Sequence, residues 1–254
     1  MIDIHCHLLP GVDDGAADEE TAVAMCRLAA AKGTTDVVAT PHANHRYEFT
    51  PERNEELRRR LQELAGPLPR IHLGCDFRLT YDNIEAALAH PKRFTVNGGQ
   101  YLLVEFSDQV ISQGTSEVFE RMGQAGLTPI ITHPERNPLL RQHHARLAAW
   151  VERGCLLQVT GQSLLGTFGS RARDAACAMI DAGLVHVIAS DGHDVSNRPP
   201  VLAESYAFVV DRWGQDIAQQ LFVENPQAVI EGRLIAPPRP KVRRSKRWWE
   251  VWKI

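Results

Sequence analysis

Short apolar or β-branched runs recur along the chain at intervals of about thirty residues, and this spacing constrains the fold more than any other feature. The runs lie at residues 2–4, 36–39, 71–73, 101–104, 129–131, 156–159 and 185–189. Helical patterns separate them at residues 18–32, 51–64, 116–125, 139–153 and 170–182, and several end in glycine, as helices often do. The alternation predicts parallel strands joined by crossover helices.

A chain of 254 residues with 44% hydrophobic content can bury one large core. Seven strand–helix units in this length predict an α/β fold that closes into a regular or distorted barrel. An open, doubly wound sheet is the alternative. Because the chain has no GxGxxG or GxxxxGKS/T loop, the usual nucleotide-binding reason to prefer the open sheet is missing.

The overall charge gives no sign of a nucleic-acid partner. The formal net charge is -3, so the molecule as a whole has no basic field that would follow a phosphate backbone. The first residues, Met1 to His5, do not resemble a leader sequence, and no apolar run reaches the ~18 residues of a membrane span. We therefore expect a cytoplasmic protein.

The five cysteines are widely spaced in apolar segments, which is typical of reduced core thiols. Many tyrosine phosphatases use a cysteine nucleophile followed six positions later by a phosphate-binding arginine. The residues at that distance from Cys6, Cys26, Cys75, Cys155 and Cys177 are valine, lysine, tyrosine and two glycines. A thiolate mechanism therefore lacks its arginine.

Nearly every predicted strand is followed by side chains that bind metal ions. In chain order these are His5, His7, Asp13 and Asp14; His42; Asp76; Glu105; His133; and Asp191 with His193. The carboxyl ends of barrel strands form one face, so we expect these residues to converge although they are far apart in sequence. Alternate residues of a strand point to the same side, which allows His5 and His7 to bind one cation together.

Imidazole and carboxylate ligands without thiolates suit Mn, Fe or Zn, and about nine ligands are enough for two or three divalent ions. So many titratable groups at one barrel mouth would be desolvated or repel each other without cations. Two arginines follow the same strands, Arg136 and Arg198, and their guanidinium groups suit phosphate oxygens. The remaining histidines are interpreted as ordinary surface or loop residues: His45, His72, His90, His143, His144 and His186.

The motifs MIDIHCHLLPGVDDGA, TPH, LLVEFS, THPER, HVIASDGH, NRPP and ENPQAVIEG occur in this order over residues 1 to about 235. In this order they resemble the bacterial PHP-type (polymerase and histidinol phosphatase) tyrosine-protein phosphatases of capsule and exopolysaccharide loci. The resemblance implies a single distorted (β/α)7 barrel, similar to a TIM barrel, with its metal site at the carboxyl ends of the strands. It also implies metal-dependent hydrolysis of phosphotyrosine, with manganese, iron or zinc as the ion.

Position by position, the resemblance implies nine metal ligands and two phosphate-binding arginines. The ligands are His5, His7, Asp14, His42, Asp76, Glu105, His133, Asp191 and His193, and the arginines are Arg136 and Arg198. The family usually has glutamate at the position of Asp76, so the shorter side chain puts a bridging role there in doubt. The implied substrate is the tyrosine-rich C-terminal tail of a bacterial kinase that controls polysaccharide synthesis and export.

The expected mechanism is in-line attack on phosphorus by a metal-activated hydroxide, with metal ions and arginines neutralising the phosphate oxygens. Two alternatives remain open: a small-molecule phosphatase acting on a substrate such as histidinol phosphate, and a phosphotyrosine-binding module without turnover. A nuclease is a weaker interpretation, because no basic groove is visible.

The composition changes near the C-terminus, which predicts a domain boundary. We expect residues 1–236 to form the catalytic barrel and residues 237–254 to form a basic, tryptophan-rich tail. Such a segment suits contact with an acidic partner or with an anionic membrane surface, and the latter would place the protein at the inner face of the membrane. A solvated terminus is the alternative.

Overall fold

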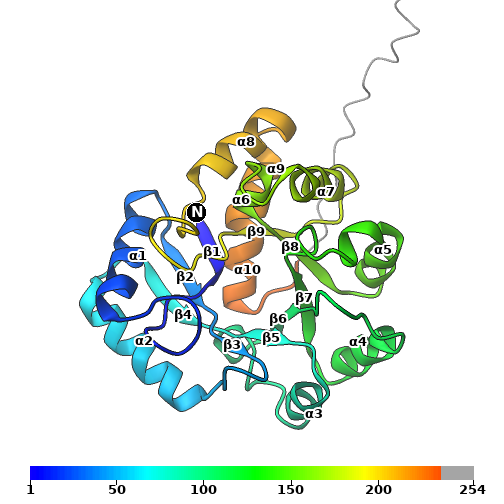
Figure 1. Ribbon diagram of the computed structural model, residues 1–254, viewed down its shortest axis with the longest axis horizontal. Helices are drawn as coiled ribbons and strands as arrows, with labels where there is room; N and C mark the ends of the chain where they lie inside the picture. The colour runs from blue at the N-terminus through cyan, green and yellow to red at the C-terminus, as the bar shows by residue number, and fades with distance from the viewer. Residues whose placement is uncertain (236–254) are drawn as a thin grey trace, which may run out of the picture.

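The computed structural model describes residues 1–235, and in that part of the chain it has nine strands, all paired in parallel. The strands are β1 (Ile2–Cys6), β2 (Asp36–Ala39), β3 (His42–Ala43), β4 (Arg70–Leu73), β5 (Asp76–Arg78), β6 (Tyr101–Glu105), β7 (Thr128–Thr132), β8 (Leu156–Thr160) and β9 (Val187–Ala189). Figure 1 shows them at the centre of the molecule with helices around them.

The connecting segments are mostly helical. The helices are α1 (Glu19–Ala31), α2 (Pro51–Ala65), α3 (Tyr81–Ala89), α4 (Thr115–Gln124), α5 (His144–Glu152), α6 (Gly161–Leu164), α7 (Ser170–Asp181), α8 (Ala203–Trp213), α9 (Gln215–Gln219) and α10 (Asn225–Glu231). Short 3-10 turns lie at Val96–Gly98 and Leu140–Gln142, and a π-helical turn at Gln220–Glu224 joins α9 to α10. The start of α1 is fixed by Asp18, whose side chain accepts a hydrogen bond from the Thr21 N–H at 2.8 Å.

The strands form a ring, so the predicted barrel is confirmed and the open sheet is excluded. Hydrogen-bonded neighbours follow the orders β1-β2-β4 and β3-β5-β6-β7-β8-β9. The first and last strands then meet: the Asp191 N–H donates to the His5 carbonyl, and the His7 N–H donates to the Gly192 carbonyl, each at 2.8 Å. This contact closes the ring beside the residues predicted to bind metal.

The prediction of seven strands was wrong in one respect, because two of the strand lines are interrupted. β3 continues the line of β2 after Thr40–Pro41, and β5 continues that of β4 after Gly74–Cys75. Pro41 has no N–H to donate, so the ladder breaks there, although its carbonyl still accepts from the Asp76 N–H at 3.1 Å. The two interruptions distort the barrel next to His42 and Asp76.

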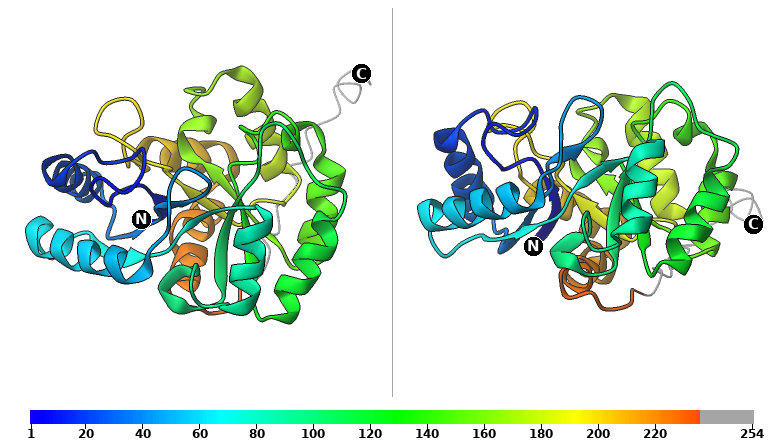
Figure 2. Two further views of the ribbon diagram at one scale, coloured as in Figure 1. Left: turned by 60° about the horizontal axis from the view of Figure 1, so that its bottom comes forward. Right: turned by 90° about the horizontal axis from the view of Figure 1, so that it is seen from below.

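Apolar clusters cover the barrel outside and close its amino-terminal end. α1 and α2 pack side by side against β1, β2 and β4 (Figures 1 and 2). α10 lies in the middle of the ring, where Val229 contacts the interior residues of the strands (Figure 1). The Tyr101 hydroxyl donates to the Arg233 carbonyl at 2.5 Å and ties the following segment to β6. The opposite, carboxyl-terminal mouth is left for polar side chains.

Further expectations from the sequence concern the cysteines, the remaining histidines and the tail. The five cysteines are free and buried, as predicted. His186 is not a surface residue: it is only 1% exposed, and its Nδ1 accepts the Leu157 N–H at 3.2 Å. The predicted tail, residues 237–254, lies outside the described residues. Among the described residues, no helix is long and apolar enough to cross a membrane.

Candidate metal centre

The structure brings the nine predicted ligands together at the carboxyl ends of the strands. They are supplied by β1 and the loop after it, by β3, β5 and β6, and by the loops after β7 and β9. The barrel topology predicts this arrangement, in which nine residues from six parts of the ring lie together at one face. Their metal-binding role stays a prediction that the geometry supports.

His5 and His7 lie at the centre of this face. Their Nε2 atoms are 3.3 Å apart, and each ring is held from behind by a hydrogen bond at Nδ1. Gln158 Oε1 lies 2.8 Å from Nδ1 of His5, and Asp13 Oδ2 lies 2.7 Å from Nδ1 of His7. Such contacts fix ring orientation and leave Nε2 available to a metal ion.

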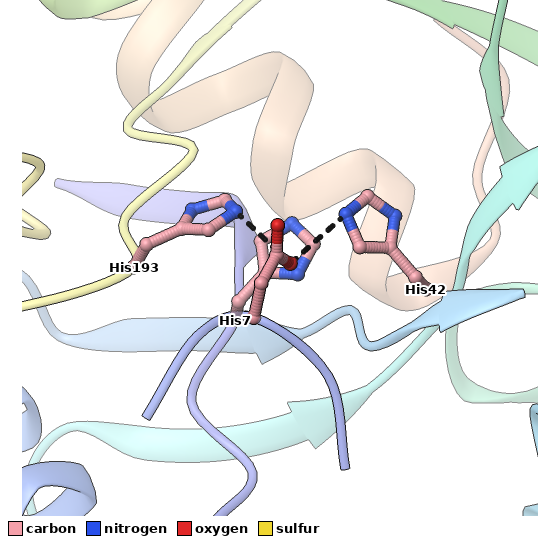
Figure 3. A group of neighbouring side chains, drawn as sticks. His7, His42 and His193 are labelled. Atoms are coloured by element: carbon pink, nitrogen blue, oxygen red, sulfur yellow. Dashed lines mark ion pairs between the residues drawn. The ribbon is translucent and has the colours of Figure 1, made fainter. Parts of the chain in front are cut away.

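Neighbouring donor atoms fall into three overlapping groups. Within each group the donor atoms lie within 4.8 Å of one another: His7, Asp14, His42 and His193; His5, His7 and Asp76; and His42, Asp76 and Glu105. In Figure 3 the rings of His7, His42 and His193 approach one another, and Asp14 Oδ1 lies 3.3 Å from Nε2 of His42 and 3.7 Å from Nε2 of His193. Shared members make this a candidate multinuclear centre.

Asp76 provides the test of whether these residues fit metal ions. Its side chain is fully buried, yet neither carboxylate oxygen has a hydrogen-bond partner, and neither does Nδ1 of His42. Oδ2 is near imidazole nitrogens all the same, 3.1 Å from His42 Nδ1 and 3.6 Å from His5 Nε2. Buried carboxylates without hydrogen-bond donors are costly unless a cation balances them, so the donor set fits divalent ions.

His133 and Asp191 belong to none of the three groups but border them. The His133 ring lies 5.8 Å from that of His5, and Asp191 Oδ1 lies 3.5 Å from Nε2 of both His5 and His7. Both residues have a positive backbone φ angle, 35° for His133 and 53° for Asp191. Residues other than glycine rarely adopt this conformation. Strained backbone of this kind is concentrated at functional sites.

The carboxylates of the site stabilise charged imidazoles. Burial alone would lower the pKa of His7, but the charge and hydrogen bond of Asp13 outweigh it and raise the pKa to about 9. Burial also opposes protonation of His42, yet the nearby carboxylates of Asp14 and Asp76 raise its pKa to about 11. The site therefore attracts positive charge strongly.

Two other histidines remain neutral, which is the form that binds a metal ion. Burial is the main reason that the pKa of His133 falls to about 3, and the nearby charge of Arg136 lowers it further. Burial likewise lowers the pKa of His193 to about 3, with a contribution from the charge of His7.

Arg136 and Arg198 both reach the mouth, where they meet the same carboxylate. Arg136 Nη1 pairs with Asp191 Oδ2, and Arg198 Nη2 lies 2.5 Å from that oxygen. Their side chains are 24% and 27% exposed, so they border both the buried ligands and solvent. Two guanidinium groups beside a cation site can bind an anionic group such as phosphate.

The sequence interpretation missed the residues that hold the histidine rings. Asp13 was grouped with Asp14 among the potential metal ligands, but it orients His7 and accepts hydrogen bonds from the Gly15 N–H at 2.9 Å and the His42 N–H at 3.1 Å. Gln158 follows no motif, and its position on β8 opposite His5 depends on the closed ring. Glu135, part of the THPER motif, is buried and accepts from Ser163 Oγ at 2.7 Å, so it ties loops together.

A ring of parallel strands with imidazoles, carboxylates and arginines at its carboxyl end defines a metal-dependent barrel hydrolase. The chain belongs to the CpsB/CapC family of capsular polysaccharide synthesis, which matches residues 1–231. The resemblance to PHP-type bacterial phosphatases is thereby confirmed.

Two bacterial relatives match the sequence of this chain over nearly their whole length. The chain is 33% identical over 252 residues to the tyrosine-protein phosphatase YwqE of Bacillus subtilis, covering 96% of this chain and 98% of the relative. Identity to the tyrosine-protein phosphatase CpsB of Streptococcus pneumoniae is 30% over 245 residues, covering 92% and 100%.

Comparison with solved structures identifies the same relatives. A structure from a study of YwqE and CpsB, described as unique metal-dependent tyrosine phosphatases, superposes with a TM-score of 0.87 at 31% identity and covers 94% of this chain and 98% of that chain. The lactonase Lmo2620 of Listeria monocytogenes shares the fold alone, with a TM-score of 0.61 at 13% identity over 90% of this chain and 94% of the other.

Proposed function

We propose that the chain is a metal-dependent protein-tyrosine phosphatase whose ions are bound by the nine converging residues. The observation that carries the proposal is Asp76, a buried carboxylate without hydrogen-bond donors that belongs to two of the three donor groups. The donor sets suit two or three divalent ions, with manganese the first choice and iron or zinc the alternatives. The proposed ligands are His5, His7, Asp14, His42, Asp76, Glu105, His133, Asp191 and His193.

Bound divalent ions would supply Lewis-acid charge and lower the pKa of water to near neutrality. The proposed contribution of the protein is to bind and orient the phosphate through Arg136 and Arg198, a role supported by their partly exposed guanidinium groups beside Asp191. A tyrosine phenolate, with a pKa of about 10, leaves with little protonation.

A cysteine nucleophile has no support. All five thiols are buried, and burial, together with nearby carboxylates, raises the pKa of Cys6 and Cys75 well above the usual range. Thiols of this kind remain protonated and unreactive. Hydrolysis without a covalent phosphoenzyme is therefore the proposed route.

The test is phosphate release from a phosphotyrosine peptide by protein purified without chelator and supplied with Mn. We expect EDTA, or a His5→Ala and His7→Ala variant, to abolish release. Wild-type protein that is loaded with metal and binds the peptide without releasing phosphate would instead support the binding-module alternative.

A small-molecule phosphatase is the second enzymatic alternative, because the same metal centre would serve either substrate. The ratio of kcat/KM on a phosphotyrosine peptide to that on histidinol phosphate separates the two. A strong preference for histidinol phosphate would contradict the protein-phosphatase assignment.

The proposed partner is the phosphorylated C-terminal tail of a bacterial tyrosine kinase, and the proposed location is the cytoplasm, at the inner face of the membrane. The family's association with capsular polysaccharide supports such a partner. Residues 1–236 would be the catalytic unit and residues 237–254 the membrane-contacting tail. Deletion of residues 237–254 should leave peptide hydrolysis unchanged and abolish binding to vesicles of anionic lipid.

A further inference from the structure

One face of Arg136 is covered by an aromatic ring from a different loop. The guanidinium carbon of Arg136 lies 4.2 Å from the centroid of the Phe168 ring, while Nη1 pairs with Asp191. Arg136 follows β7, whereas Phe168 lies between α6 and α7. A guanidinium group is attracted to an aromatic face at this distance, so the ring limits the directions in which Arg136 can turn.

The loop that carries Phe168 is held in one conformation. Gly166 and Gly169 flank the ring with φ angles of 87° and 85°, a region that glycine adopts without strain. The Thr167 N–H donates to the Gln162 carbonyl at 3.2 Å, and the Gly169 N–H donates to the Gly166 carbonyl at 2.9 Å. The loop is short and hydrogen-bonded internally, which makes it a firm support for the ring.

A second contact joins the loop after β7 to β8 and α6, which precede the Phe168 loop. Glu135, next to Arg136 in the chain, is fully buried and accepts from Ser163 Oγ at 2.7 Å and from the Thr160 N–H at 2.9 Å. Adjacent residues after β7 therefore contact the segment from β8 to α7 twice, once through a buried carboxylate and once through the guanidinium group. Neither contact is with a proposed metal ligand.

We propose that Phe168 is a positioning residue, which holds the Arg136 guanidinium toward the centre of the site and supports phosphate binding through it. The inference rests on the proposed function, in which Arg136 donates to the substrate phosphate. Phe168 does not contact the reacting atoms, and the ring face that meets Arg136 is not available to a substrate.

The first experiment measures binding of inorganic phosphate to the metal-loaded protein by calorimetry. We expect Phe168→Leu, which keeps an apolar side chain but removes the aromatic face, to weaken binding by about three- to tenfold. Phe168→Tyr keeps the face and should bind like wild type. The matched control is Trp213→Leu, which removes a similar stack with Arg212, 4.7 Å away on α8, and should not change phosphate binding.

A double-mutant cycle asks whether Phe168 acts through Arg136. In an Arg136→Ala background, Phe168→Leu should cause no further loss of phosphate affinity. Independent, multiplicative losses would overturn the proposal. It would also fail if Phe168→Leu left phosphate binding intact but raised KM for phosphotyrosine peptide, since that result assigns the ring to the substrate's aromatic group.

Phosphate binding also separates this inference from the proposed function. If wild-type protein hydrolyses no phosphate ester, yet Phe168→Leu weakens phosphate binding and Phe168→Tyr does not, the phosphatase assignment fails and the positioning role stands. Wild-type protein that does not bind phosphate at all would overturn the positioning role.

Discussion

Nδ1 of His7 lies 2.7 Å from Oδ2 of Asp13, a residue six positions later in the chain. This contact fixes the ring, so that Nε2 faces His5 and the centre of the site. Asp13 also accepts the backbone N–H groups of Gly15 and His42. Asp13 therefore connects His7, at the end of the first strand, to the following loop and to β3. We expect it to influence the site by orienting His7 and His42.

Asp13→Ala is expected to weaken metal binding by about 10- to 100-fold, because the His7 ring loses its orienting partner. Titration of metal-free protein against a competing chelator measures the affinity. Asp18→Ala is the control, since Asp18 caps α1 at the surface and should cost only about 1 kcal/mol of stability. Unchanged metal affinity in Asp13→Ala would show that packing alone orients His7.

Asp76→Asn should affect two of the donor groups at once, because Asp76 belongs to both. We expect it to lose more metal per chain than Asp14→Asn, whose residue belongs to one group and is half exposed. Metal analysis after gel filtration gives the stoichiometry. Equal losses in the two variants would contradict a bridging position for Asp76.

Arg136→Ala and Arg198→Ala should each reduce kcat/KM by about 100-fold or more, because each removes a charged donor to the phosphate. Metal content should stay normal. Arg212→Ala, which removes a surface pair with Asp181, is the control with unchanged kinetics. Loss of metal from either active-site variant would mean that the arginines serve mainly to hold Asp191.

Gly15 allows the loop after β1 to fold back on His7. A Cβ at this position would lie 2.2 Å from the His7 carbonyl oxygen, so Gly15→Ala should destabilise the protein by about 2 kcal/mol or more. Gly123→Ala is the matched control: nothing lies within 4 Å of its Cβ, and helix α4 should gain about 0.5–1 kcal/mol. Urea unfolding measures both; a neutral Gly15→Ala would show that the loop can move.

His186 predicts a specific pH dependence of stability. Burial lowers its folded-state pKa to about 4, below the ordinary histidine value of 6.5, so the unfolded chain binds the proton first as the pH falls. Its contribution to stability is fully present above pH 6.5 and decreases by about 1.4 kcal/mol per pH unit down to about pH 4.

His186→Asn should therefore be less sensitive to acid than wild type, because asparagine can still accept the Leu157 N–H but does not titrate. Urea unfolding of the metal-free proteins between pH 7 and pH 4 measures the difference, which we expect to approach about 3 kcal/mol. Parallel curves for the two proteins would contradict a neutral, buried His186.

The sequence predicts the barrel because its apolar runs and helical patterns alternate, and it predicts the convergence of His5, His7 and Asp191 because strand ends share one face. It does not predict β3 and β5, since two- and three-residue strands give no periodic signal. Burial of His186 was missed for a related reason: a single polar residue does not reveal which face of a strand is covered.

The supporting residues are harder to predict than the ligands they support. Gln158 and Phe168 are ordinary residues in sequence. Gln158 contacts His5 only after β8 and β1 meet in the closed barrel, and Phe168 contacts Arg136 only after two loops pack together. The residue type alone suggests a metal ligand. A residue that orients a ligand can be identified only from its contact in the folded structure.

The pairing of the first strand with the segment after the last has a consequence for how the protein matures. His5 and His7 are synthesised before Asp191 and His193, which follow some 190 residues later, and the ring closes only through them. α10, which seals the opposite end, is made later still. A nascent chain that stops before His193 therefore lacks the complete donor set, and metal acquisition on this geometry must follow synthesis of the last ligand.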